Sequence, residues 1–261
     1  MLIDSNAYIG NWPFRKLNYN TCKLLSERMT EFDVDLSLIS NLNGVFYKNT
    51  QSANEELYKE INSSRKFKSK FIPISVINPV YNGWRNDFDI CIQKFGMRGV
   101  RIYPKYHRYE LLDPACIELI KRCRDANIPV ILSLRMVDKR PSSWLDIDEE
   151  WALKDVMPII RQVPDAKYIF VNIANGSELN NDDTDLLRKS KVLMDTSGRA
   201  LANLGRLISK YGSDKYVFGT HSPILDYCTG LLRIEALNGT EADEKVKEDL
   251  RSGNLKRFFN L

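Results

Sequence analysis

The chain has 261 residues, of which 43% are hydrophobic and 28% are charged. A disordered chain would carry less apolar surface, so this composition is typical of a folded globular protein. The net charge is +4, from 38 basic and 34 acidic residues, and so small an excess gives no argument for nucleic acid as a partner. The length fits one large domain, and we expect residues 1–261 to fold as a single unit.

The cysteines and the N-terminus bear on the cellular compartment. Five cysteines are scattered along the chain without a C-x-x-C pair, which is typical of buried thiols in a reducing compartment. The first residues show neither the basic region nor the apolar run of a signal peptide. No apolar stretch is long enough to cross a membrane. We therefore expect a cytoplasmic protein that has no membrane partner.

Short apolar runs recur along the chain, with helical patterns between them. Eight of these runs predict strands, at residues 2–4, 36–39, 71–77, 99–103, 129–134, 168–173, 192–195 and 216–219. Most of them are continuously apolar rather than alternating. That pattern is typical of parallel strands that are buried on both faces.

One-faced helical patterns lie between the predicted strands. The clearest cover residues 54–62, 114–126, 152–163 and 201–211, and helices of this kind are suited to cover a sheet. Eight strands alternating with helices over this length predict a single (β/α)8 TIM barrel of the α/β class. The alternative is an open doubly wound sheet. We prefer the barrel because the segment after the first predicted strand lacks the glycine-rich turn that such a sheet usually has.

Polar residues at the ends of the predicted strands are the candidates for a site, because barrel enzymes place their active sites there. These residues are rich in amides and cations and poor in metal ligands. The chain has only two histidines, His107 and His221, whereas a catalytic zinc needs about three His, Cys or carboxylate ligands. Asp4, Asp195 and His221 could converge, but their spacing does not show it. We therefore expect no metal centre and no cofactor.

Arg101 and Arg135 stand at the ends of two predicted strands. Arginine binds carboxylate or phosphate through two parallel hydrogen bonds, so a small anionic ligand is one interpretation. A structural ion pair with Asp195 or another loop carboxylate is the other, and the sequence leaves both open. His221 is a candidate general base because the pKa of histidine lies near neutrality. A histidine that only hydrogen-bonds a loop is the alternative.

Six segments carry patterns that occur in the same order in one known family. They are residues 3–10, 96–104, 127–130, 192–198, 217–223 and 253–259. Residues 96–104, for example, are GMRGVRIYP, where the family has G-x-x-G-V-K-L-x-P. Through these segments the chain resembles the amidohydrolase superfamily, and within it the amidohydrolase-related group that includes aminocarboxymuconate-semialdehyde decarboxylase and pyrone-dicarboxylate lactonase. The resemblance implies the same barrel.

The chain departs from this family where the family binds its metal. Asn6 and Tyr8 stand at the two histidine positions of the pattern I-D-x-H-x-H-x-G. The strand-five histidine falls near position 133 or 134, the strand-six histidine at about Asn172, and His221 replaces the strand-eight aspartate. Asparagine and tyrosine are poor zinc ligands compared with histidine, so the resemblance does not carry metal-assisted hydrolysis to this chain. Relatives of the lactonase type are thought to hold substrate carboxylates with arginine and tyrosine instead.

Two hypotheses about function follow. In the first, the chain is a metal-independent hydrolase or lyase that acts on a small carboxylate-bearing molecule, such as a lactone. His221 would then activate water as the catalytic base. The substrate-binding residues would hold the anion or donate to a developing oxyanion; they are Asn6, Tyr8, Arg101, Tyr103, Arg135 and Asn172. In the second, the barrel has lost its chemistry and serves as a small-anion binding or scaffold protein. The sequence leaves a homo-oligomer open.

Overall fold

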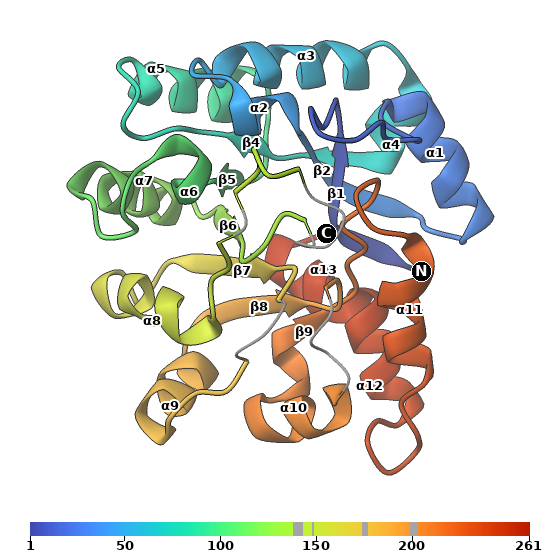
Figure 1. Cartoon of the computed structure of the whole chain (residues 1–261). Coiled ribbons are helices and arrows are strands. Elements are labelled where there is room, and N and C mark those ends of the chain that lie inside the picture. The colour runs from blue at the N-terminus through green and yellow to red at the C-terminus, as the bar shows by residue number, and fades with distance from the viewer. Residues whose placement is uncertain (138–142, 148, 174–176, 199–202) are drawn as a thin grey trace.

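The computed structural model describes residues 1–137, 143–147, 149–173, 177–198 and 203–261. Parallel strands alternate with helices along the chain (Figure 1). The strands are β1 (Ile3–Ile9), β2 (Leu36–Asn41), β3 (Phe71–Pro73), β4 (Ser75–Val76), β5 (Val100–Ile102), β6 (Pro129–Ser133), β7 (Lys167–Val171), β8 (Lys191–Asp195) and β9 (Tyr216–Val217). The α-helices are α1 (Cys22–Glu31), α2 (Asn43–Phe46), α3 (Gln51–Asn62), α4 (Arg65–Lys70), α5 (Trp84–Asp89), α6 (Pro104–His107), α7 (Pro114–Asp125), α8 (Leu153–Gln162), α9 (Asn181–Lys189), α10 (Leu204–Tyr211), α11 (Tyr227–Glu235), α12 (Glu244–Glu248) and α13 (Asn254–Phe259). The π-helices are η1 (Ile90–Lys94) and η3 (Asp249–Gly253), and the 3₁₀ turn is η2 (Ser213–Lys215).

The strands pair in chain order, β1 to β3 and β4 to β9. β3 and β4 are two halves of one barrel strand, interrupted only at Ile74. The Ile74 amide donates to the carbonyl of Ile39 on β2, at 2.8 Å, and the Ser75 amide donates to the carbonyl of Gly99 beside β5, at 3.0 Å. The chain therefore changes its partner from β2 to β5 at this residue.

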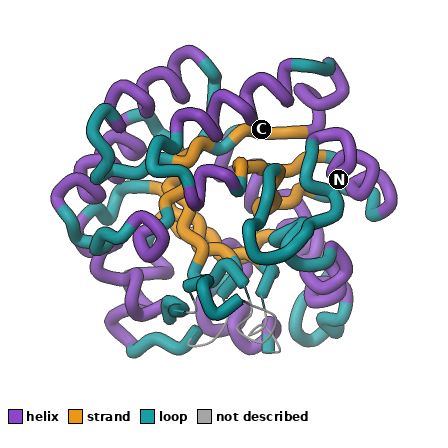
Figure 2. The backbone as a smooth tube through the Cα atoms, turned by 45° about the horizontal axis from the view of Figure 1, so that its top comes forward, coloured by secondary structure: helices purple, strands orange, loops and turns teal. Residues whose placement is uncertain are grey.

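The last strand returns beside the first and closes the barrel. The Ser5 amide donates to the carbonyl of Phe218 at 2.9 Å, and the Tyr8 amide donates to the carbonyl of Ser222 at 2.8 Å. The strands form a ring inside a layer of helices (Figure 2). The structure confirms the predicted (β/α)8 barrel.

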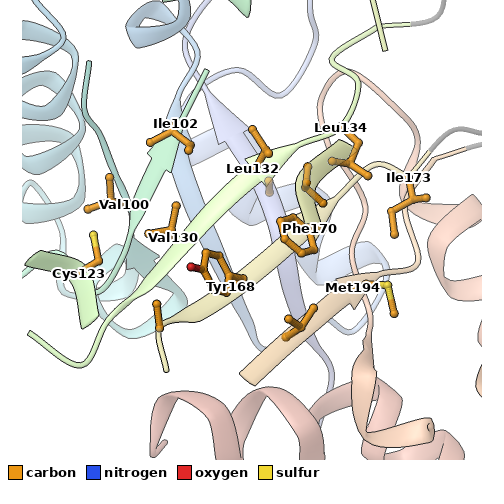
Figure 3. Packing of buried hydrophobic residues seen from close by; sticks show 14 of the residues in the cluster. Val100, Ile102, Cys123, Val130, Leu132, Leu134, Tyr168, Phe170, Ile173 and Met194 are labelled. Atoms are coloured by element: carbon orange, nitrogen blue, oxygen red, sulfur yellow. The ribbon is translucent and has the colours of Figure 1, made fainter. Parts of the chain in front are cut away.

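Apolar side chains fill the space on both sides of the strands. Val130, Leu132 and Phe170 point outward and belong to the large cluster between strands and helices (Figure 3). Ile131 and Ile169 alternate with them and point inward, where Leu255 and Phe259 of α13 join the same cluster; α13 thus closes the N-terminal end of the barrel. Burial on both faces explains why the sequence shows continuous apolar runs.

The predicted elements correspond to observed ones with two kinds of difference. All eight predicted strands overlap observed strands, but β1 continues to Ile9, beyond the predicted end at residue 4. The predicted helices correspond to α3, α7, α8 and α10, except that residues 201 and 202 lie outside the described residues. The helical patterns did not predict α9, because few residues of this helix are apolar. Within the described ranges, no helix is long and apolar enough to cross a membrane.

Candidate functional site

A β-bulge in β1 directs two site residues into the barrel. Asp4 pairs with Ser37 of β2 and Ala7 pairs with Ile39, so β1 has one more residue than β2 between these pairs. Ile3 belongs to the interior cluster. With strict alternation of side chains along the strand, Asn6, three positions after Ile3, would therefore point outward. The extra residue lets Asn6 and Tyr8 face the interior as well, which is a known use of bulges beside functional sites.

Arg101, from β5, is fully buried at the centre of the barrel. Its Nη1 atom donates to Asn6 Oδ1 at 2.9 Å and to the Tyr8 hydroxyl, and the guanidinium carbon lies 4.4 Å from the centre of the Tyr8 ring. Nε and Nη2 have no hydrogen-bond partner among the described residues. No described carboxylate forms an ion pair with Arg101, so the predicted alternative of a pair with Asp195 is not what the described structure shows.

Arg135 follows β6 and has a different environment. Its side chain is 4% exposed and its Nη1 atom lies 3.2 Å from Glu150 Oε1. An ion pair with a loop carboxylate is therefore present for Arg135. Its Nε atom has no hydrogen-bond partner within the described part of the chain.

The Asn6 amide connects the cation to the other polar groups of the site. Its Oδ1 atom accepts from Arg101. Its Nδ2 atom lies 2.8 Å from Asp195 Oδ2 and 3.0 Å from His221 Nδ1. One fully buried amide thus contacts a guanidinium, a carboxylate and an imidazole, which come from different strands or strand ends.

His221, just after β9, is fully buried and its two ring nitrogens face different partners. Nε2 lies 2.8 Å from the carbonyl oxygen of Met136, so Nε2 carries the proton and Nδ1 accepts from Asn6. Burial lowers the pKa of His221 to about 3, and the charges of Arg101 and Arg135 act in the same direction. The imidazole is therefore neutral at physiological pH and a weak acceptor of a further proton. Its backbone φ of 59° lies in the left-handed region, which is uncommon outside glycine.

Two buried carboxylates, Asp195 and Asp4, hydrogen-bond to residues that build the site. Asp195 accepts hydrogen bonds from the backbone amide of Asn172 at 2.8 Å and from Ser197 Oγ at 2.6 Å. Burial raises the pKa of Asp195. Burial also raises the pKa of Asp4 to about 6, although the Thr220 hydroxyl donates to it at 2.7 Å. Gly219 leaves room for one of them, because a Cβ atom there would lie 2.5 Å from Asp195 Oδ2.

Among the described residues, packed side chains fill much of the space directly above the centre of the barrel. A cavity of about 20 Å³ remains, with Tyr103, Ser133 and Arg135 among its lining residues, and this is room for about one water molecule. A group of buried apolar side chains covers the site, and we call it the mouth cluster; it consists of Trp12, Leu17, Leu42, Val45, Val76, Met136, Val137 and Ile224 together with the rings of Tyr8 and Tyr103.

The described residues do not make the donor set of a metal site. No group of three or more His, Cys, Asp or Glu side chains that could hold a metal ion occurs among them. Asn6 and Tyr8, which stand at the family's histidine positions, both bind the same guanidinium nitrogen of Arg101. A fixed organic cation occupies the space between these two residues, and it would repel a metal ion.

The sequence-predicted residues lie close together, but Tyr103 and Asn172 are outside the central network; Tyr103 packs in the mouth cluster and its hydroxyl has no hydrogen-bond partner among the described residues. Asn6, Tyr8, Arg101 and His221 form one network. Asn172 donates from Nδ2 to the carbonyl of Arg135, at 2.6 Å, and its Oδ1 atom has no hydrogen-bond partner in the described structure.

Three residues that were not among the predicted catalytic or binding residues complete the network, and the sequence leaves open the convergence of Asp4 and Asp195 with His221. Ser133 Oγ lies 3.1 Å from the Tyr8 hydroxyl, and the carboxylates of Asp4 and Asp195 hold the strand ends from which the site is built. The signal for the carboxylates was present, because a charged residue inside an apolar strand is rarely buried without a partner. His107 lies away from the site, with Nε2 3.0 Å from the carbonyl of Gly44.

No protein-family model and no curated protein matches the sequence. Solved structures do match its fold. A dihydroxybenzoic acid decarboxylase from Polaromonas sp. JS666, with bound manganese and the inhibitor 2-nitroresorcinol, is 14% identical; the match covers 100% of this chain and 97% of that one, with a TM-score of 0.74. The 4-oxalomesaconate hydratase of Rhodopseudomonas palustris is 14% identical, with coverage of 100% and 96% and a TM-score of 0.70.

An amidohydrolase from Mycobacterium avium subsp. paratuberculosis K-10 is also similar. It is 13% identical, and the match covers 92% of this chain and 74% of that one, with a TM-score of 0.65. The structural neighbours thus include the amidohydrolase class that the sequence motifs resemble. At these identities the likeness establishes the TIM-barrel fold.

Proposed function

We propose that the chain binds a small carboxylate inside the barrel and acts on it as a hydrolase or lyase without a metal ion. Arg101 is the group that holds the anion. The observation that carries this proposal is the environment of the guanidinium, which is fully buried, donates to neutral oxygens of Asn6 and Tyr8, and keeps two nitrogens without a hydrogen-bond partner among the described residues.

The buried Arg101 guanidinium forms no ion pair with a described carboxylate. Burying a cation without a counter-ion is expensive, and proteins usually pair it with a carboxylate. Two neighbouring N–H groups of one guanidinium match the two oxygens of a carboxylate. A ligand carboxylate at Nε and Nη2 would therefore satisfy both donors and neutralise the charge. Arg135 and Tyr103 line the adjoining cavity, where they would contact the rest of the ligand.

The names of the structural neighbours support the substrate class. Two of them are a dihydroxybenzoic acid decarboxylase and a 4-oxalomesaconate hydratase, and both names refer to small carboxylic acids. The manganese belongs to the decarboxylase structure. In this chain the described residues around Arg101 do not fit a metal ion.

His221 remains the proposed base, and its environment also favours a second candidate function. In the reaction, Nδ1 would take a proton from a water molecule after moving away from Asn6. Both ring nitrogens are engaged, however, and the pKa of about 3 makes this a weak base at neutral pH. These features favour a barrel that binds a small anion without changing it, as a binding or scaffold protein.

Arg101→Met tests the proposal, because it removes the charge and keeps an unbranched side chain of similar length. The variant relieves a buried charge but leaves the buried Asn6 Oδ1 atom without its donor, so the two effects on stability oppose each other, and circular dichroism establishes that it is folded. Binding of 2,6-dihydroxybenzoate should be lost in ligand-observed NMR. Arg85→Met, at an exposed arginine of α5, is the control.

Assays with the same ligand and a panel of lactones distinguish the two candidate functions, an enzyme and a binding protein. Turnover detected by mass spectrometry, and lost in His221→Gln, supports the enzyme. Binding without turnover supports the binding protein. Unchanged affinity for 2,6-dihydroxybenzoate in Arg101→Met would contradict both.

A further inference from the structure

A second cavity opens at the C-terminal end of the barrel, beside the closed centre. It has a volume of about 280 Å³ and lies between two loops, residues 15–19 after β1 and residues 222–227 after β9. Arg15 joins the loops, because its Nη2 atom donates to the carbonyl of Ile224 at 2.7 Å. The volume is close to the lower limit of about 300 Å³ that is usual for small-molecule sites, and ligand sites of this fold lie at this end.

The lining of this cavity, which we call the Arg15 pocket, is strongly cationic. Arg15, Lys16 and Arg28 line it, together with a single carboxylate, Asp226. Arg28 is already neutralised, because Nη2 lies 3.0 Å from Asp226 Oδ1 and Nη1 pairs with Glu31. Arg15 and Lys16 form no ion pair with a described residue. Two exposed cations of this kind face a cavity whose described lining offers no free acid to balance them.

The backbone also holds this lining in an unusual conformation. Tyr19 has a φ of 54°, in the left-handed region that a tyrosine rarely adopts. Its ring lies beneath the guanidinium of Arg28, with 5.2 Å between the guanidinium carbon and the ring centre. Residues held in such conformations occur preferentially at ligand sites, where the surrounding structure supports them.

We propose that the Arg15 pocket binds an oxyanion, the phosphate or carboxylate group of a small molecule, through Arg15 and Lys16. The guanidinium supplies N–H groups that the contact with Ile224 leaves available, and the ammonium group supplies a second charge. Arg101 is not among the residues that line this pocket, and the proposal does not depend on the carboxylate proposed for Arg101.

Calorimetric titration with inorganic phosphate and with succinate, at constant ionic strength, tests the inference. Wild-type protein should bind at least one of these probes saturably, and tighter binding of phosphate or of succinate identifies the preferred group. Arg15→Gln/Lys16→Gln should weaken that binding about tenfold or more, because two charge-assisted contacts are lost. Lys23→Gln, an exposed lysine of α1 outside the lining, should leave the Kd unchanged.

Arg101→Met distinguishes this site from the centre of the barrel. It should keep the binding of the preferred probe, whereas loss of that binding would place the anion at Arg101 and overturn the inference. Absence of saturable binding by the wild type, or an equal Kd in wild type and Arg15→Gln/Lys16→Gln, would overturn it as well. Circular dichroism establishes that each variant is folded.

Discussion

Asn6 determines how the charges at the centre of the barrel face one another. Its carbonyl oxygen accepts from Arg101 and its amide nitrogen faces Asp195 and His221. An aspartate at this position would bring a second acceptor against the Asp195 carboxylate, and a histidine would lack the oxygen that Arg101 needs. The amide is therefore suited to a barrel whose central cation is a guanidinium.

His221 gives a pH dependence whose sign follows from its burial. The pKa of His221 is lowered from 6.5 to about 3 in the folded protein, so the unfolded chain binds the proton more readily. This group stabilises the fold above pH 6.5, and its contribution is lost as the pH falls toward 3. Each pH unit below 6.5 should cost about 1.4 kcal/mol. His221→Gln, which does not titrate, should lack this loss in urea denaturation at pH 7.5 and pH 5.

Asp4 changes the stability of the fold with pH in the opposite direction to His221, and it serves as the comparison. The pKa of Asp4 is raised from 3.8 to about 6, so protonation stabilises the fold as the pH falls from 6 toward 3.8, and this contribution is lost as the pH rises through 6. Asp4→Asn should therefore lose more stability than the wild type on acidification. Equal pH profiles for wild type and His221→Gln would contradict the assignment of a neutral, buried imidazole.

At the scale of elements, the contact between β1 and β9 closes the barrel through side chains as well as backbone. The Thr220 hydroxyl donates to Asp4 Oδ2 at 2.7 Å and accepts from the Ser222 amide at 3.0 Å. Both carboxylate oxygens of Asp4 are used, since the Asn6 and Thr220 amides donate to Oδ1. One carboxylate thus joins the first strand to the loop that carries His221.

Thr220→Val should weaken this closure. The substitution keeps the shape of the side chain and leaves the buried Asp4 carboxylate and the Ser222 amide short of a partner, which should cost about 1–3 kcal/mol in unfolding free energy. Thr30→Val, at an exposed threonine of α1, should change stability by less than about 0.5 kcal/mol. Equal losses in the two variants would show that the contact between Thr220 and Asp4 contributes little.

The strands were predictable because burial on both faces leaves an apolar run in the sequence, as in residues Ile169 and Phe170 of β7. The end of β1 was not predictable from the sequence, because Asn6 and Tyr8 are polar residues within a strand. Only the bulge explains how their side chains face inward. The site residues at strand ends were predictable from the barrel alone. Their partners were not, since Arg101 meets neutral oxygens whereas Arg135 meets Glu150, and sequence spacing does not distinguish these outcomes.

For the molecule as a whole, the two ends of the barrel are closed by different means. α13 fills the N-terminal end with Leu255 and Phe259, and the mouth cluster covers the C-terminal end. The polar network lies between two apolar layers, where low polarity strengthens every interaction within it.

The metal content of the purified protein tests this picture. With the Arg101 guanidinium between Asn6 and Tyr8, we expect substoichiometric zinc and manganese by elemental analysis. We also expect no change in melting temperature on addition of a chelator, because a metal that stabilised the fold would be removed by it. A stoichiometric metal that survives dialysis, together with a lower melting temperature in the chelator, would contradict the proposal.

The mouth cluster has a kinetic consequence. A ligand that binds Arg101 has to displace packed side chains such as Trp12 and Met136. The rate of binding is therefore limited by a rearrangement of the protein and not by diffusional collision. In stopped-flow experiments the observed rate should level off as guest concentration rises, and association should be slower than the 10⁵–10⁷ M⁻¹s⁻¹ that is roughly normal for open sites. By the same reasoning a captured guest should leave slowly, so that a modest affinity would still give a long-lived complex.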